Sequence, residues 1–284
     1  MSTAQRIFHG AFGRIALLQM DTALVPHAHS ECHVLLKAGG ADSSFAVKGH
    51  RQPLTDRTAV LVNAWEPHGY NHEVPEQPTL ILALYIEPAW LAQMKRSLSL
   101  SARPDFFSQP CVELAPQMRS ISDALITEMM SLGTVPRERV EELLFSLLIH
   151  VFERFSEWRH LTRVTTPAVA WAQDARIRRA REFIVNNIDQ EIRLDALARE
   201  CGLSRAQFFH LFRRSTGVTP HMLISTERMR RACEWLASGR TGTLGQLSES
   251  LGFSEHGHFT RFFRNHLGAA PSQYQRVVDR YTNA

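Results

Sequence analysis

The chain has 284 residues, which is enough for two domains with separate hydrophobic cores. Its content of 44% hydrophobic and 21% charged residues is ordinary for a globular protein and argues against a disordered or fibrous chain. No apolar run approaches the roughly 20 residues of a membrane-spanning helix, no signal-peptide pattern opens the chain, and the four cysteines show no paired CxxC spacing. We therefore expect a cytoplasmic protein with reduced thiols and no membrane contact.

Positive charge is concentrated in the second half of the chain. Residues 171–284 contain 17 arginines, no lysine and 11 acidic residues, whereas residues 1–170 contain 15 basic and 17 acidic residues. This distribution favours a C-terminal domain that contacts phosphates, although a solvated charged surface would give the same counts.

Residues 1–87 show the pattern of an antiparallel β-domain. Short β-rich segments at 13–20, 33–37, 44–49, 58–62 and 79–86 are separated by Gly, Pro, Asp and Asn. Strands of this length and spacing predict a sandwich or a small barrel.

Helical periodicity begins after Pro88. Residues 88–98, 113–132 and 136–156 are predicted helices, and residues 157–171 are a predicted linker. The last helix carries one broad apolar face, formed by Val140, Leu143, Leu144, Leu147, Leu148, Val151 and Phe152. Such a face fits packing inside the domain, or a homodimer contact made by residues 88–156.

Histidines gather at two points of the predicted β-domain. His29 lies two positions and His33 six positions after His27, so a strand would place the three on one face, and a hairpin could bring His68 beside them. Converging imidazoles could bind zinc, iron, nickel or copper. The same residues could instead be turn and rim histidines, or polar anchors for an organic ligand.

A motif in the last third of the chain occurs twice. Leu197, Gly202 and Ser204 recur fifty positions later as Leu247, Gly252 and Ser254. A second set recurs fifty-one positions later, in which Phe208, Phe212, Arg213, Gly217 and Pro220 correspond to Phe259, Phe263, Arg264, Gly268 and Pro271. Each copy predicts a short helix, a tight turn at the glycine and a second helix, for which Ser204 is the N-cap in the first copy. This is a helix-turn-helix, a DNA-binding motif.

The two copies resemble the paired helix-turn-helix signature of the AraC/XylS transcription regulators. The resemblance is carried by GLSRAQFFHLFRRSTGVTP and GFSEHGHFTRFFRNHLGAAPSQY, and it places a DNA-binding domain at residues 172–284. It implies an α+β protein with an N-terminal cupin-like antiparallel β-barrel followed by helices, and an all-α C-terminal domain. It also implies a homodimer that binds double-stranded DNA in response to a small-molecule effector, more often as an activator that contacts RNA polymerase.

The resemblance also implies which residues meet DNA. The two recognition helices, near Ser204–Thr216 and Glu255–His266, would enter successive major grooves, and a helix over Pro220–Ser238 would set their separation near ~34 Å. The base-facing positions carried over from the family are Arg205, Ala206, Phe209, His210, His256, Gly257, Thr260 and Arg261. Arg261 and His210 can hydrogen bond to guanine, whereas Phe209 and Ala206 offer only apolar contact. Arg213, Arg214 and Arg264 lie further along the helices and are expected on phosphates.

The first half of the chain resembles the cupin-type sensor domain of these regulators more loosely. The pattern HxH, three residues, His33, six residues and Gly40 resembles the first cupin motif, with His33 in place of its glutamate. His68 falls at the histidine of the second motif, and His72 falls where asparagine is usual. The effector-binding candidates are His27, His29, His33, Trp65, His68 and Tyr70. A divalent transition metal, as cofactor, would use His27, His29, His33 and His68.

Two other functions would use the same region. A cupin enzyme would hold a catalytic metal at the four histidines, but Glu31 is expected to point elsewhere, and such an enzyme would not need residues 171–284. A thiol sensor would use Cys32, although an isolated cysteine in a strand is more often simply buried. No catalytic residue is assigned.

Overall fold

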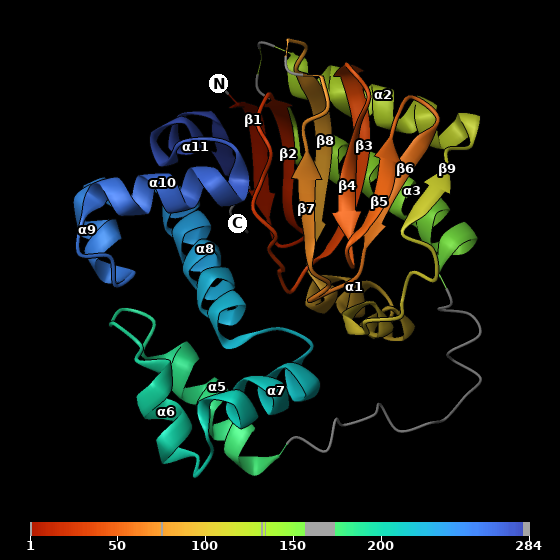
Figure 1. The fold of residues 1–284 in the computed structure, drawn as a ribbon. Coiled ribbons are helices and arrows are strands. Elements are labelled where there is room, and N and C mark those ends of the chain that lie inside the picture. The colour runs from red at the N-terminus through yellow and green to blue at the C-terminus, as the bar shows by residue number, and fades with distance from the viewer. Residues whose placement is uncertain (1, 75, 132, 134, 157–173, 281–284) are drawn as a thin grey trace.

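The computed structural model describes residues 2–74, 76–131, 133, 135–156 and 174–280, so the predicted linker at residues 157–171 lies outside the described residues. The α+β class is confirmed, because a strand-rich N-terminal domain is followed by a C-terminal domain of helices (Figure 1). Within the described ranges, none of the helices combines the length and apolar character that a membrane span requires.

The strands of the N-terminal domain form two sheets. They are β1 (Thr3–Gly10), β2 (Gly13–Met20), β3 (Cys32–Gly40), β4 (Ser43–Val47), β5 (His50–Leu54), β6 (Thr58–Val62), β7 (His68–Asn71), β8 (Thr79–Ile86) and β9 (Cys111–Glu113). The larger sheet has the order β10-β1-β2-β8-β3-β6-β9 and the smaller has the order β5-β4-β7, where β10 is Val278–Arg280. The predicted antiparallel barrel therefore takes the form of two sheets, and its edge strand β1 pairs in parallel with the C-terminal β10.

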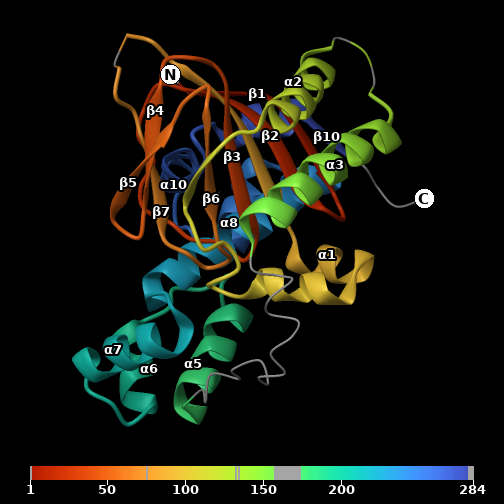
Figure 2. The same ribbon diagram turned by 90° about the vertical axis from the view of Figure 1, so that its right-hand side faces the viewer.

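Helices cover the outer face of the larger sheet. Figure 2 shows α2 (Pro116–Met130) and α3 (Arg137–Phe155) lying across this sheet, whereas α1 (Pro88–Met94) lies below the ends of the strands and is followed by the 3-10 helix η1 (Arg96–Ala102). All seven residues of the predicted apolar face of α3 are buried in the core that this sheet shares with α2. That face is therefore core packing within one chain, while a homodimer contact by other surfaces of residues 88–156 stays a prediction.

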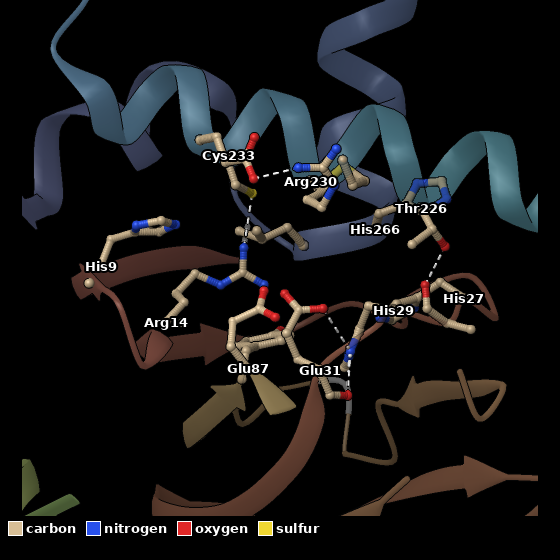
Figure 3. Close-up of a pocket in the computed structure, with 17 residues that line it drawn as sticks. His9, Arg14, His27, His29, Glu31, Glu87, Thr226, Arg230, Cys233 and His266 are labelled. Carbon is tan, nitrogen blue, oxygen red and sulfur yellow. Dashed lines mark hydrogen bonds and ion pairs between the residues drawn. The ribbon is translucent and has the colours of Figure 1, made fainter. Parts of the chain in front are cut away.

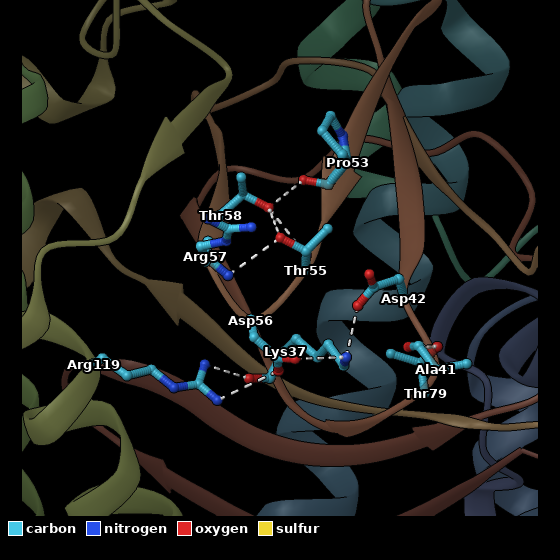
Figure 4. Close-up of polar contacts among 10 residues, drawn as sticks. All are labelled: Lys37, Ala41, Asp42, Pro53, Thr55, Asp56, Arg57, Thr58, Thr79 and Arg119. Carbon is cyan, nitrogen blue, oxygen red and sulfur yellow. Dashed lines mark hydrogen bonds and ion pairs between the residues drawn. The ribbon is translucent and has the colours of Figure 1, made fainter.

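Polar contacts fasten α2 to the same sheet (Figure 4). The buried ammonium of Lys37 on β3 lies 2.6 Å from the carboxylate of Asp42 and 3.2 Å from that of Asp56. Arg119 of α2 donates to the carbonyl oxygen of Lys37 at 2.8 Å. The charge of Lys37 is thus compensated where the helix crosses the strand.

The C-terminal domain contains both predicted helix-turn-helix motifs. Its helices are α5 (Ala175–Asn186), α6 (Leu194–Glu200), α7 (Arg205–Thr216), α8 (Pro220–Ser238), α9 (Leu244–Ser250), α10 (His256–Leu267) and α11 (Pro271–Val277). The pairs α6–α7 and α9–α10 are the two motifs, and α8 joins them, as the sequence predicted (Figure 1). Ser204 caps α7 by accepting from the backbone N–H of Gln207, which confirms its assignment as the N-cap.

The two motifs contact the N-terminal domain to different extents. Residues of α8–α11, including Phe259, Phe263 and Tyr274, share one hydrophobic core with the sheet residues Leu18 and Tyr85. The first motif has its own core, to which the N-terminal domain contributes the buried Ala28 and the partly buried Trp65. The second motif is therefore docked far more extensively than the first.

A matched pair of glycines tests this docking. Gly217 and Gly268 end α7 and α10 with φ angles of 79° and 85°, so alanine at either position costs about 1–2 kcal/mol of backbone strain. A Cβ atom at Gly217 meets no described atom within 4 Å, whereas at Gly268 it would lie 2.7 Å from Sδ of the buried Met20. We expect Gly268→Ala to lower the free energy of unfolding more than Gly217→Ala, measured by urea denaturation of the full-length chain. An equal decrease in the free energy of unfolding for both variants would show that the Met20 side chain moves aside at no energetic cost.

Candidate functional site

The positions predicted to face DNA bases lie on the accessible side of the two recognition helices. Six of them are exposed, namely Arg205, Ala206, His210, His256, Gly257 and Arg261, whereas Phe209 and Thr260 are half-buried. The predicted phosphate contacts Arg213 and Arg214 are exposed and Arg264 is half-buried. Gly257 leaves open space where a side chain would stand, since no described atom lies within 4 Å of an added Cβ.

Two of these side chains are engaged within the first motif. The guanidinium of Arg205 forms an ion pair with Asp195 on α6 and lies 5.2 Å from the ring centre of Phe209. Phe209 also packs against His221, at 5.7 Å between ring centres. Arg205 and Phe209 are therefore partly occupied by contacts within the C-terminal domain.

A cavity of about 200 Å³ lies between the two domains (Figure 3). Its N-terminal wall includes His9, Arg14, His27, His29, Glu31, Tyr85 and Glu87, and its C-terminal wall includes Thr226, Met229, Arg230, Cys233, Glu234, His266 and Leu267. Of these residues, the sequence predicted only His27 and His29 as effector contacts. The others meet only because α8 and α10 pack against the sheet, and no local pattern in the sequence signals that packing.

Polar contacts across the cavity hold α8 against the N-terminal domain. Thr226 donates from Oγ1 to the carbonyl oxygen of Ala28 at 2.5 Å, and Arg14 donates from Nη1 to Sγ of Cys233 at 2.9 Å. The guanidinium of Arg14 also lies 3.8 Å from the ring centre of Tyr85. Because arginine stays charged in proteins, a permanent positive charge stands half-buried at this interface.

The four histidines predicted as metal ligands are brought together at one end of the cavity. His27 and His68 exchange backbone hydrogen bonds of 2.8 Å, which places their ring centres 4.4 Å apart. The ring centres of His29 and His68 are 4.8 Å apart, and those of His33 and His68 are 5.3 Å apart. One nitrogen from each of His27, His29 and His68 lies within 4.8 Å of the other two.

Backbone carbonyls fix the tautomers of three of these rings. The Nδ1 atoms of His27, His29 and His68 lie 2.9, 3.1 and 2.8 Å from the carbonyl oxygens of Val25, Glu31 and Glu66, respectively. Because a carbonyl oxygen can only accept, each Nδ1 carries the proton and each Nε2 keeps its lone pair. Burial also lowers the pKa of His27 and His29 well below their usual value and that of His68 to about 3. The three rings are therefore neutral and each keeps a lone pair on Nε2, as a metal-binding histidine held through Nδ1 does.

His33 is the fourth histidine of the cluster and contacts both His29 and His68. Its Nδ1 lies 3.3 Å from Nε2 of His29 and 3.4 Å from Nε2 of His68, and its ring stacks on Tyr85. Its Nε2 is buried and has no hydrogen-bond partner among the described residues. Such an unsatisfied group costs free energy unless something binds there.

Several predicted contacts lie elsewhere. Trp65 lies outside the cavity and packs against the first helix-turn-helix, because its backbone N–H donates to the carbonyl oxygen of His29 and its φ of 62° turns the chain. Tyr70 is fully buried inside the N-terminal core, and His33 and His68 are buried below the cavity lining. Glu31, expected to point away, lines the cavity with its Oε2 3.5 Å from Nδ1 of His29.

The thiol-sensor hypothesis fails on burial. Cys32 is fully buried and its Sγ lies 3.0 Å from the carbonyl oxygen of Ser101. Burial raises the pKa of this thiol to about 12, so the reactive thiolate is scarce at pH 7.

Glu87 makes the interface sensitive to pH. Burial and the nearby Glu31 raise the pKa of Glu87 from 4.5 to about 7. The folded state therefore binds more protons than the unfolded state between these pH values, so the free energy of unfolding falls as the pH rises through this window.

We expect Glu87→Gln to remove this decline and to raise Tm at pH 8 by about 2–4 °C, allowing for solvent screening. Scanning calorimetry of the wild type and the variant at pH 5 and pH 8 measures Tm. The same difference in Tm between the two pH values in both proteins would contradict the prediction.

The chain matches two protein families along its length. Residues 10–148 match the AraC-like ligand binding domain, and residues 197–277 match a helix-turn-helix domain. Among curated relatives, the Msm operon regulatory protein of Streptococcus mutans is 26% identical over 165 residues, which are 55% of this chain and 57% of that protein. The virulence regulon transcriptional activator VirF of Yersinia enterocolitica is 33% identical over 95 residues, 34% of this chain and 35% of that protein. The matched part thus covers less than two thirds of the length of either relative.

Solved structures share the fold across both domains. The crystal structure of an apo single-residue variant of ToxT from Vibrio cholerae aligns with a TM-score of 0.58 and 13% identity over 96% of this chain and all of that chain. The fold is therefore shared with that solved chain over both domains. On these grounds, the chain belongs to the AraC family of transcription regulators, with an N-terminal sensor domain.

Proposed function

We propose that this protein is a sequence-specific DNA-binding transcription regulator whose interdomain cavity binds a small effector. The proposal rests on one observation, namely that each of the two domains supplies one wall of the cavity. One wall is α8, the helix that joins the two DNA-binding motifs, and the other belongs to the N-terminal domain. A ligand in this position contacts both domains at once.

The position of α8 determines how the two recognition helices fit DNA. Two helix-turn-helix units bind successive major grooves only when their separation is near one helical repeat, ~34 Å. In this structure α8 is held by Thr226 and Cys233, which contact Ala28 and Arg14. An effector that binds more tightly to one arrangement of α8 than to another shifts the population between them and so changes DNA affinity.

Other parts of the proposal rest on the family alone. They are binding as a homodimer, activation through RNA polymerase and location in the cytoplasm. A metal-dependent enzyme is the alternative use of the histidine cluster. We consider it weaker because helices of the DNA-binding domain supply half of the cavity wall, which a catalytic site would not need.

Arg261 tests the assignment of the DNA-reading surface. We expect Arg261→Ala to weaken binding to the preferred DNA by roughly 1–3 kcal/mol and to relax specificity at one base pair, because its guanidinium can make two hydrogen bonds to guanine. The preferred DNA would be selected from random duplexes with the purified full-length protein, and affinities measured by fluorescence anisotropy.

Arg213→Ala is the matched control. We expect it to weaken binding to preferred and scrambled DNA equally and to reduce the salt slope by about one, since it is assigned to a phosphate. If Arg261→Ala behaves in the same way, Arg261 contacts a phosphate. If selection finds no preferred sequence, the proposed function is wrong.

A further inference from the structure

The DNA-binding domain contributes a histidine to the same cavity. His266 stands near the end of α10, and its Nδ1 lies 2.7 Å from the carbonyl oxygen of Phe262. Nδ1 therefore carries the proton and Nε2 keeps its lone pair, as in His27, His29 and His68. The same backbone-fixed tautomer thus occurs on both sides of the interface.

His266 lies next to the histidine cluster. The ring centres of His266 and His27 are 6.1 Å apart, and both residues line the cavity (Figure 3). The backbone N–H of Val25 donates to the carbonyl oxygen of Asn265 at 3.1 Å, so the loop before His27 is joined to the residue before His266. The two rings are therefore held near each other by the backbone.

We propose that a divalent transition metal binds Nε2 of His27, His29 and His68 and takes His266 as its fourth ligand. The proposal rests on the proposed function and names its effector. Four neutral imidazoles suit zinc, copper, nickel or cobalt. At a tetrahedral zinc with Zn–N bonds of about 2.0–2.1 Å, ligand nitrogens stand about 3.4 Å apart. The ligand atoms of His27, His29 and His68 now lie within 4.8 Å of one another, so these three side chains would draw closer around an ion, and His266, whose ring centre is 6.1 Å from that of His27, would approach them.

The surroundings of the cluster suit a cation. Glu31 places a carboxylate oxygen 3.5 Å from Nδ1 of His29, where it offsets part of the positive charge. Nδ1 of His33 lies 3.3 and 3.4 Å from Nε2 of His29 and His68, so a hydrogen-bonding ring already stands beside two of the proposed ligand atoms.

Metal binding of this kind would control the second recognition helix. The ion would join α10 to the N-terminal domain, and α10 carries the base-facing candidates Thr260 and Arg261 within two turns of His266. The metal would therefore change DNA affinity, and DNA would change metal affinity by the same factor.

The test uses full-length protein stripped of metal and titrated with Zn²⁺ by calorimetry and with Co²⁺ by visible absorption. We expect one ion per chain, loss of binding in His29→Ala, and at least a tenfold weaker affinity with an altered Co²⁺ spectrum in His266→Gln. The control is His258→Gln, an exposed histidine on the same helix, which should bind both metals like the wild type. Metal should change the affinity of the wild type for its preferred DNA and leave that of His266→Gln unchanged.

The outcomes separate this inference from the proposed function. Absence of metal binding, or equal affinity and spectra for the wild type and His266→Gln, would overturn the interdomain site even if specific DNA binding is intact. Metal binding that depends on His266 in a protein without specific DNA binding would support the site and overturn the regulatory function.

Discussion

The arrangement of the whole molecule depends on the hydrophobic core shared by the N-terminal sheet and the second helix-turn-helix. Burial of apolar surface is the dominant favourable term in folding, and here one continuous cluster includes Leu18 and Tyr85 on the sheet and Phe263 and Tyr274 on the helices. Pairing of β10 with β1 and an ion pair of 2.7 Å between Arg6 and Asp279 close the same junction at its edge. The helices of the second motif therefore pack against the sheet of the N-terminal domain through a shared core.

The cavity beside this core contains charged groups that packing alone does not require. Arg14 is half-buried and its buried Nε lacks a hydrogen-bond partner among the described residues, while burial and the nearby Glu31 raise the pKa of Glu87 to about 7. Buried charges that are incompletely paired cost free energy, so an interface selected only for stability would replace them by apolar residues. Their presence in the wall that faces α8 is consistent with an interface that exchanges contacts between the two domains for contacts with a ligand.

Local features of the fold could be predicted from the sequence because they depend on neighbouring residues. The capping of α7 by Ser204, the turn at Gly202 and the bounds of α8 follow from side-chain chemistry and helical periodicity. The apolar face of α3 was also visible, but periodicity shows only that a face is buried and leaves its partner open. The structure assigns that face to the sheet of the same chain.

The candidate site could be predicted only in part, for the same reason. The strand periodicity predicted that His27, His29 and His33 share one face, and the cupin resemblance added His68. Trp65 lies against the first motif and does not line this cavity, and its positive φ has no signature in the sequence. Arg14, Cys233 and His266 could not be found, since they are far apart in the sequence and meet only through the packing of the two domains.

The contrast between α7 and α10 explains how one cavity can govern DNA binding. The base-facing positions of α10 lie in its first two turns, whereas His266 and Leu267 at its other end line the cavity. A helix of twelve residues is about 18 Å long and stiff, so a change of contacts at one end displaces the reading side chains at the other. α7 has no such connection to the described cavity lining, and its Arg205 is restrained by Asp195 within the first motif. A coupling of about 1–3 kcal/mol, the usual range for two linked sites, corresponds to a few hydrogen bonds or one metal ligand gained at the end of α10. Under the proposed function, the first motif would contact DNA without lining the cavity itself, and the second would make binding conditional on what the cavity contains.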